Sequence, residues 1–352
     1  MAKEIPSHLC KQQIERIQIP DLKKTGQIFE MKYPLFLLLF LLILPFGYGN
    51  TLDRTRTADT LKLDTHEIVP ISDSRQYIRI KGSVENPVLL FLSGGPGDTV
   101  TGSMKQMFSK LSEEFLVVLW DIRSTGETAK LGNSKPEFTQ ELFERDTREL
   151  TGYLLNRFGK EKLYLAGLSW GTVLGFYMVE HHPELLHAFI AVSPIIDQVR
   201  SEKMSIELLM KEAGAENNET AVSELSLVEV PFKNADQLYY SRKWIFIKEG
   251  NSLGKKKSFK KYVYNWSATW LELFNEGIQT NLFESLPAVE CPVYFIVGKN
   301  DYRTLYTLAE AYYKDLKAPV KGFFLFENSG HLIPYQDRAR FQKTIIDSIL
   351  KK

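Results

Sequence analysis

The sequence predicts an α/β protein in which helices cover both faces of a mostly parallel central sheet. Two observations support this expectation. Short apolar runs of strand length alternate along the chain with longer stretches of helical pattern. Residues 195–286 interrupt that alternation with helical and polar stretches alone, which indicates a helical insertion between two core strands.

The strand prediction depends on several short runs, some of them apolar throughout, as is typical of strands buried on both faces. These runs are Tyr77–Lys81, Val88–Leu92, Leu116–Trp120, Leu163–Ala166, Ala188–Val192, Pro292–Val297 and Phe323–Phe326.

Between these runs the spacing of apolar residues predicts helices. In Glu141–Phe158, Leu150 and Leu154 recur at helical spacing, and Gly159 follows as a stop signal. The other predicted core helices are Trp170–His182, which ends before a proline, Thr304–Leu316 and Tyr335–Leu350.

The inserted segment is expected to be a lid over the carboxyl ends of the strands. It is rich in aromatic residues, most of which should form the core of the lid itself while a minority line a pocket. The chain is thus divided into a first part of the core at 60–194, the helical lid at 195–286 and a second part of the core at 287–352.

The N-terminal segment 1–49 is interpreted as an upstream extension followed by a signal peptide. The apolar run Leu35–Leu44, extended to residue 46, is too short to span a bilayer but has the length of a signal-peptide core. Met31-Lys32 resembles the start of a secreted precursor, and Gly47-Tyr48-Gly49 supplies small residues for cleavage. We therefore expect export to the periplasm or the medium. The alternative is a membrane anchor through residues 35–46.

The composition argues against several other classes of protein. The formal net charge of +1 gives no overall bias toward nucleic acid, and the basic run at Lys255–Lys257, Lys260 and Lys261 is interpreted as a solvated face. Cys10 lies in the leader. Cys291 precedes Pro292 at the start of an apolar run and is therefore expected to be a buried structural thiol. No metal-ligand cluster or phosphate-binding loop is evident, and no metal or cofactor is predicted.

A serine at a strand–turn–helix junction indicates a nucleophile. Gly167-Leu168-Ser169-Trp170-Gly171 follows the run Leu163–Ala166 and opens a predicted helix. A G-x-S-x-G sequence in this setting is typical of a nucleophile elbow, which presents the serine hydroxyl above the sheet. Ser169 is therefore the candidate nucleophile.

A serine hydroxyl needs a general base, and the position of His331 fits that role. Of the six histidines, only His331 lies beyond the last core strand, where the chain order serine, acid, histidine requires the base. Asp301 follows the run Pro292–Val297 and is the expected acid. Asp197, after an earlier strand, is the alternative.

The oxyanion formed during acyl transfer needs two backbone N–H donors. Trp170, directly after the nucleophile, is one candidate. Gly95 is the other, because it lies in Ser93-Gly94-Gly95-Pro96-Gly97, directly after the run Val88–Leu92.

Taken together, these motifs resemble those of the proline iminopeptidase-like α/β-hydrolases, from about Glu67 to Phe341. The family's H-G-G-P-G loop is matched by Ser93–Gly97, its D-x-R-G-x-G-x-[ST] segment by Asp121–Thr128, and its G-x-S-W-G elbow by Gly167–Gly171. Its acid and histidine elements fall on Asp301 and His331. The resemblance implies an α/β-hydrolase fold with a cap domain and a serine hydrolase that uses no cofactor.

The chain departs from the family at two positions, since Ser93 replaces a histidine and Ser124 a glycine. In the family's aminopeptidases, lid carboxylates hold the substrate amine. No lid carboxylate here is securely matched to that role; the candidates are Glu224, Glu229, Asp236, Glu272, Glu276 and Glu284.

The resemblance favours an aminopeptidase of the proline iminopeptidase type acting on a small molecule or short peptide. The alternatives are a carboxylesterase, a lactonase or an acyltransferase with the same triad, or a non-catalytic binding protein on this fold.

Overall fold

The computed structural model describes residues 61–103, 107–133 and 136–351. The predicted leader, with its apolar run and Cys10, lies outside these residues. In the described part of the chain, no helix is both long and apolar enough to cross a membrane.

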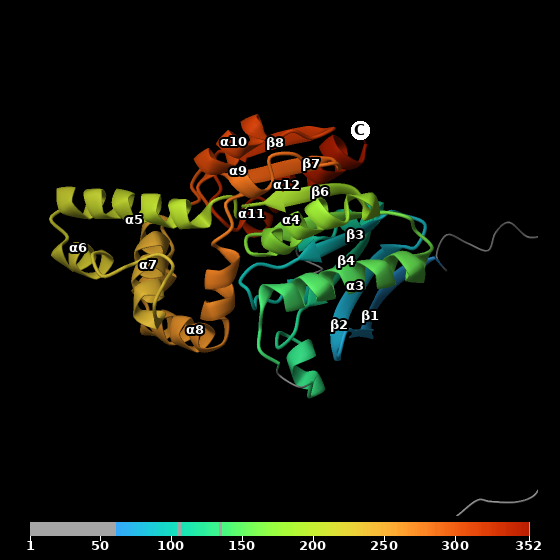
Figure 1. Ribbon diagram of the computed structural model, residues 1–352, viewed down its shortest axis with the longest axis horizontal. Coiled ribbons are helices and arrows are strands. Elements are labelled where there is room, and N and C mark those ends of the chain that lie inside the picture. The colour runs from blue at the N-terminus through green and yellow to red at the C-terminus, as the bar shows by residue number, and fades with distance from the viewer. Residues whose placement is uncertain (1–60, 104–106, 134–135, 352) are drawn as a thin grey trace, which may run out of the picture. The chain divides into compact units, whose positions relative to one another are not determined.

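Eight strands form one sheet in the order β1-β2-β4-β3-β5-β6-β7-β8 (Figure 1). The strands from β4 to β8 in this order run parallel, whereas β1 and β2 pair antiparallel at one end. Their bounds are Lys62–Ile71 (β1), Ser74–Ser83 (β2), Val88–Leu92 (β3), Leu116–Asp121 (β4), Leu163–Leu168 (β5), Leu186–Val192 (β6), Val293–Gly298 (β7) and Lys321–Phe326 (β8).

All of the predicted strand runs are therefore confirmed, and β1 is the one strand of the described residues that sequence analysis missed. It lies at the edge of the sheet, with most of its residues exposed or half-buried. The segment Lys62–Ile71 lacks a clear apolar pattern because only one end of the strand packs onto the core.

Helices cover both faces of the sheet, as predicted. The apolar cluster on one face joins residues of α3 (Gln140–Phe158), α4 (Gly171–His181) and α10 (Tyr306–Asp315) to alternate residues of the strands. The cluster on the opposite face includes α2 (Leu111–Glu114) and α12 (Arg338–Ile345). Short 3₁₀ turns occur at Thr101–Ser103, Thr128–Leu131, Pro183–Leu185 and Ser252–Lys255.

The prediction of one continuous helix over Tyr335–Leu350 is wrong, because this segment is broken into shorter helical pieces. The structure has a short helix α11 (Ile333–Gln336), then α12, then a π-helical turn over Ile346–Leu350. Asp337 interrupts the helix, because it adopts a non-helical conformation and its side chain caps α12.

Between β6 and β7 the chain forms only helices, as expected for residues 195–286. These are α5 (Gln198–Ala215), α6 (Glu219–Leu225), α7 (Ala235–Lys248), α8 (Lys257–Gly277) and α9 (Leu282–Ser285). Figure 1 shows α5 to α8 gathered together at one side of the sheet. Ile206, Leu209, Leu225 and Ile245 form a small apolar core of their own.

Cys291 is buried just before β7, and its burial raises the pKa of the thiol to about 11. The expected structural role is consistent with this position, because a thiol with so high a pKa is a poor nucleophile near neutral pH.

Candidate active site

Ser169 lies in a strained turn between β5 and α4. Its φ of 53° is in the left-handed region, which non-glycine residues rarely adopt. The Ser169 backbone N–H donates to the Val192 carbonyl at 2.9 Å, which fixes the turn to the end of β6. The structure therefore has the backbone geometry expected of a nucleophile elbow.

The glycines on either side of Ser169 permit this turn by letting backbone segments approach closely. A Cβ on Gly167 would lie 2.6 Å from the Gly171 carbonyl oxygen, and one on Gly171 would lie 2.5 Å from that of Leu92. Any larger residue would push α4 away from β3 and β5. The G-x-S-x-G spacing thus has a direct steric cause.

His331 comes from the loop after β8. Its backbone carbonyl accepts a hydrogen bond from Ser193 Oγ at 2.8 Å, so the end of β6 holds the histidine loop. Ser169 and His331 line the same cavity, although they are far apart in sequence.

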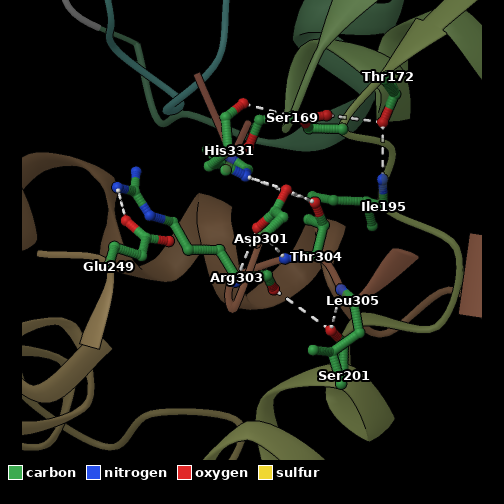
Figure 2. Close-up of polar contacts among 12 residues, drawn as sticks. Ser169, Thr172, Ile195, Ser201, Glu249, Asp301, Arg303, Thr304, Leu305 and His331 are labelled. Carbon is green, nitrogen blue, oxygen red and sulfur yellow. Dashed lines mark hydrogen bonds and ion pairs between the residues drawn. The ribbon is translucent and has the colours of Figure 1, made fainter. Parts of the chain in front are cut away.

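Asp301 follows β7 and is buried beside His331 (Figure 2). Its Oδ2 atom lies 2.8 Å from His331 Nδ1 and accepts from Thr304 Oγ1 at 2.7 Å. Its Oδ1 atom accepts from the backbone N–H groups of Arg303 and Thr304 at 2.8 and 3.0 Å. Burial alone would raise the pKa of Asp301, but His331 and these hydrogen bonds outweigh it and hold the pKa below its ordinary value.

The alternative acid, Asp197, lies elsewhere. Its carboxylate caps α5 by accepting from the Arg200 N–H at 3.1 Å, and it lines a different surface cavity. Of the two aspartates that sequence analysis left open, only Asp301 contacts His331.

The two expected oxyanion donors are on segments that meet at Ser169. Gly95 lies in a loop that lines the cavity, and its φ is 114°. Trp170 stands at the N-cap of α4, with its indole ring buried edge-on against Phe143. Their positions fit the expected arrangement, and their roles remain a proposal.

Ser93, which replaces the family's histidine, supports the same loop. Its hydroxyl donates to the Asp98 carbonyl at 2.8 Å and so closes the segment 93–98 on itself. From the inserted helices, Trp266 Nε1 donates to the Pro96 carbonyl at 2.8 Å. The loop is therefore held both by its own first residue and by α8.

The Asp121–Thr128 segment has a structural role. The Asp121 carboxylate accepts from Thr101 Oγ1 and from the Glu127 N–H, each at 2.9 Å. Arg123 forms a buried ion pair with Asp146 of α3. Ser124, the second departure from the family, has a φ of 57°, a left-handed conformation that a glycine would adopt more easily.

The cavity that contains Ser169 and His331 has a volume of about 150 Å³. Apolar and aromatic side chains of the inserted helices form most of its far wall, including Leu238, Phe246, Phe259, Val263, Trp266 and Phe274. As expected, a minority of the aromatic residues between β6 and β7 line the pocket. In the described residues, no group of three or more metal-ligating side chains is placed to hold a metal ion.

Asp98 is a cavity residue that sequence analysis missed. It directly follows the Ser93–Gly97 loop and lines the cavity, while much of the residue is exposed to solvent. Desolvation by neighbouring protein atoms raises the pKa of Asp98, while the charges of Arg303 and His331 oppose the shift. Its only signal in the sequence is its position at the end of a glycine-rich loop beside the nucleophile.

Comparison with known proteins agrees with this architecture. Residues 87–337 match the model of the alpha/beta hydrolase fold family. A curated relative from Bacillus subtilis, "Probable aminopeptidase YbaC", is 28% identical over 297 residues, which cover 78% of this chain and 93% of that protein.

Two solved structures of similar fold are named for different activities. A proline iminopeptidase from Mycobacterium smegmatis matches with a TM-score of 0.59 at 16% identity, covering 82% of this chain and 98% of its own. The carboxylesterase CesB from Bacillus subtilis matches with a TM-score of 0.54 at 15% identity, covering 82% and 92%. These two likenesses show the fold alone.

The chain belongs to the α/β-hydrolase fold family, which confirms the predicted fold class. It is a hydrolase, and its motifs are similar to those of the proline iminopeptidase-like members.

Proposed function

We propose that this hydrolase cleaves an amide or ester bond through an acyl-enzyme on Ser169. The observation that carries the proposal is the 2.8 Å contact between the buried Asp301 and His331, which lines the same cavity as Ser169. Three residues from the ends of three parallel strands thus meet at one site, in the chain order of this type of triad.

In the proposed mechanism, His331 Nε2 takes the Ser169 proton as the hydroxyl attacks the substrate carbonyl. Asp301 accepts a hydrogen bond from His331 Nδ1, which orients the ring and stabilises the imidazolium. Because the pKa of Asp301 is lowered, it stays ionised through this step. The N–H groups of Gly95 and Trp170 would stabilise the oxyanion. The protonated His331 then gives its proton to the leaving group, and water hydrolyses the acyl-enzyme.

The more specific proposal is an aminopeptidase of the proline iminopeptidase type, with α5 to α9 as its lid. Two findings support this proposal. One is the order of motifs along the chain, and the other is the match to a relative named a probable aminopeptidase, which covers 93% of that relative. An esterase is the second candidate, because the cavity is mostly apolar and an esterase is among the structural neighbours.

The test is a comparison of prolyl- and alanyl-β-naphthylamide with short p-nitrophenyl esters, on the natural chain and on Ser169→Ala. We expect hydrolysis of the naphthylamides that disappears in Ser169→Ala. Hydrolysis of the esters alone would favour the esterase. Full activity of Ser169→Ala on either class would contradict the serine mechanism.

A further inference from the structure

Two arginine side chains that line the cavity have carboxylate partners, whereas the one acidic side chain that lines it has no such partner among the described residues. Arg242 makes two hydrogen bonds to Glu202, at 2.8 and 2.6 Å, and Arg303 bonds Glu249 at 3.0 Å. Asp98 is the only acidic residue among the described residues that line this cavity. In the described part of the chain, no side chain is hydrogen-bonded or ion-paired to its carboxylate.

The carboxylates of the inserted helices are engaged elsewhere or face outward, and none of the six lid candidates lines the cavity. Glu224 binds Lys243 and Trp244, Glu229 pairs with Lys233, and Asp236 bonds Tyr264. Glu276 accepts from the Gln140 N–H, Glu284 accepts from Asn281, and Glu272 is exposed. The lid therefore presents no carboxylate to a substrate amine in this structure.

Asp98 and the nucleophile face the same small space. A Cβ built on Gly94 would lie 3.3 Å from Ser169 Cβ and 3.7 Å from Asp98 Oδ2. In an aminoacyl substrate the α-amino nitrogen is only two bonds from the carbonyl carbon that the serine attacks. A substrate bound at Ser169 can therefore place its ammonium group beside Asp98.

The backbone of Asp98 is held by two hydrogen bonds within its own loop. Its N–H donates to the Gly94 carbonyl at 3.3 Å and its carbonyl accepts from Ser93 Oγ at 2.8 Å. Because no side chain in the described part of the chain pairs with the Asp98 carboxylate, both of its oxygen atoms are available to a cation bound in the cavity. A protonated α-amino group, which has two N–H donors in a prolyl substrate and three in other aminoacyl substrates, would supply charge-assisted hydrogen bonds to this carboxylate.

We propose that Asp98 is the anchor for the substrate's free α-amino group, so that this chain selects aminoacyl substrates from the nucleophile side of the cavity. The proposal rests on the aminopeptidase function proposed above and names the residue that gives it amine specificity. The apolar and aromatic side chains of the inserted helices would contact the apolar side chain of the substrate's N-terminal residue.

The test compares two matched substrates of nearly equal shape, prolyl-β-naphthylamide and cyclopentanecarbonyl-β-naphthylamide, in which a ring CH₂ group replaces the charged ring nitrogen. The measured quantity is the ratio of their kcat/KM values. We expect the natural chain to prefer the amine and Asp98→Asn to lower the ratio about ten- to a hundredfold, because a charge-assisted hydrogen bond is lost. Asp98→Glu, which keeps the charge, should recover part of the ratio.

Two controls separate this proposal from the one on which it depends. Covalent labelling by a fluorophosphonate shows that Asp98→Asn is folded with a working nucleophile. Glu229→Gln removes an exposed lid carboxylate, paired with Lys233, and should leave the ratio unchanged.

A natural chain that prefers the amine, with an unchanged ratio in Asp98→Asn, would overturn the role of Asp98 and leave the aminopeptidase standing. A natural chain that labels but shows no preference for the amine would overturn both.

Discussion

Single residues determine the chemistry of this site through their backbone positions as much as through their side chains. Ser169 is held in a left-handed conformation, and the carbonyl of His331 is bonded by Ser193. Asp301 accepts hydrogen bonds from Thr304 and from the Arg303 backbone while it contacts His331. The backbones of Ser169 and His331 and the carboxylate of Asp301 are thus held by neighbours outside the triad, as a preorganised site requires.

The contact between Asp301 and His331 gives a prediction with a built-in control. Asp301→Asn leaves an amide that cannot stabilise the imidazolium and favours the wrong tautomer, so kcat should fall about a thousandfold or more. Asp197→Asn should change kcat little, because asparagine also caps a helix. Steady-state kinetics on both variants decide between the two aspartates. An equal loss in both would contradict the assignment.

At the scale of elements, the site depends on how tightly α4 packs between β3 and β5. Gly167 and Gly171 allow that packing, since a Cβ at either position would meet backbone carbonyl oxygens. Side chains cannot absorb such a clash, so the backbone itself would have to move.

Gly171→Ala should therefore lower the free energy of unfolding by about 1–3 kcal/mol and reduce activity as well. Gly152, in the middle of α3, is exposed and has open space where a Cβ would lie. Gly152→Ala should instead stabilise the protein by about 0.5–1 kcal/mol. Urea unfolding followed by circular dichroism measures both. A Gly171→Ala protein as stable as the natural chain would contradict the packing argument.

Most of the core could be predicted because its strands carry continuous apolar runs. Only β1 escaped, since its residues are mostly exposed or half-buried, and a break at Asp337 divides a helix whose apolar spacing continues through it. The elbow and His331 could be predicted from local motifs and chain order.

The remaining features of the site depend on contacts between distant segments. That Asp301 rather than Asp197 meets His331, and that the lid carboxylates are paired away from the cavity, follows from how the loops fold. Asp98 was missed for the same reason, because an aspartate after a glycine-rich loop has no signature until the loop closes beside Ser169.

At the scale of the whole molecule, the described fold from β1 to the last helical turn contains every residue of the proposed mechanism. We propose that residues 1–49 serve export and are removed near Gly49. N-terminal sequencing of the protein recovered outside the cytoplasm should then find a chain that begins near Asn50. A chain retained in the membrane with residues 35–46 intact would instead support the anchor.

The proposed chemistry requires Ser169 to be the activated nucleophile of this fold. The most direct measurement is the mass of the native protein after treatment with a fluorophosphonate, followed by peptide mapping of the adduct. We expect one adduct, on the peptide that contains Ser169, and its loss in Ser169→Ala. An adduct on another residue, or none on the folded natural chain, would contradict the account.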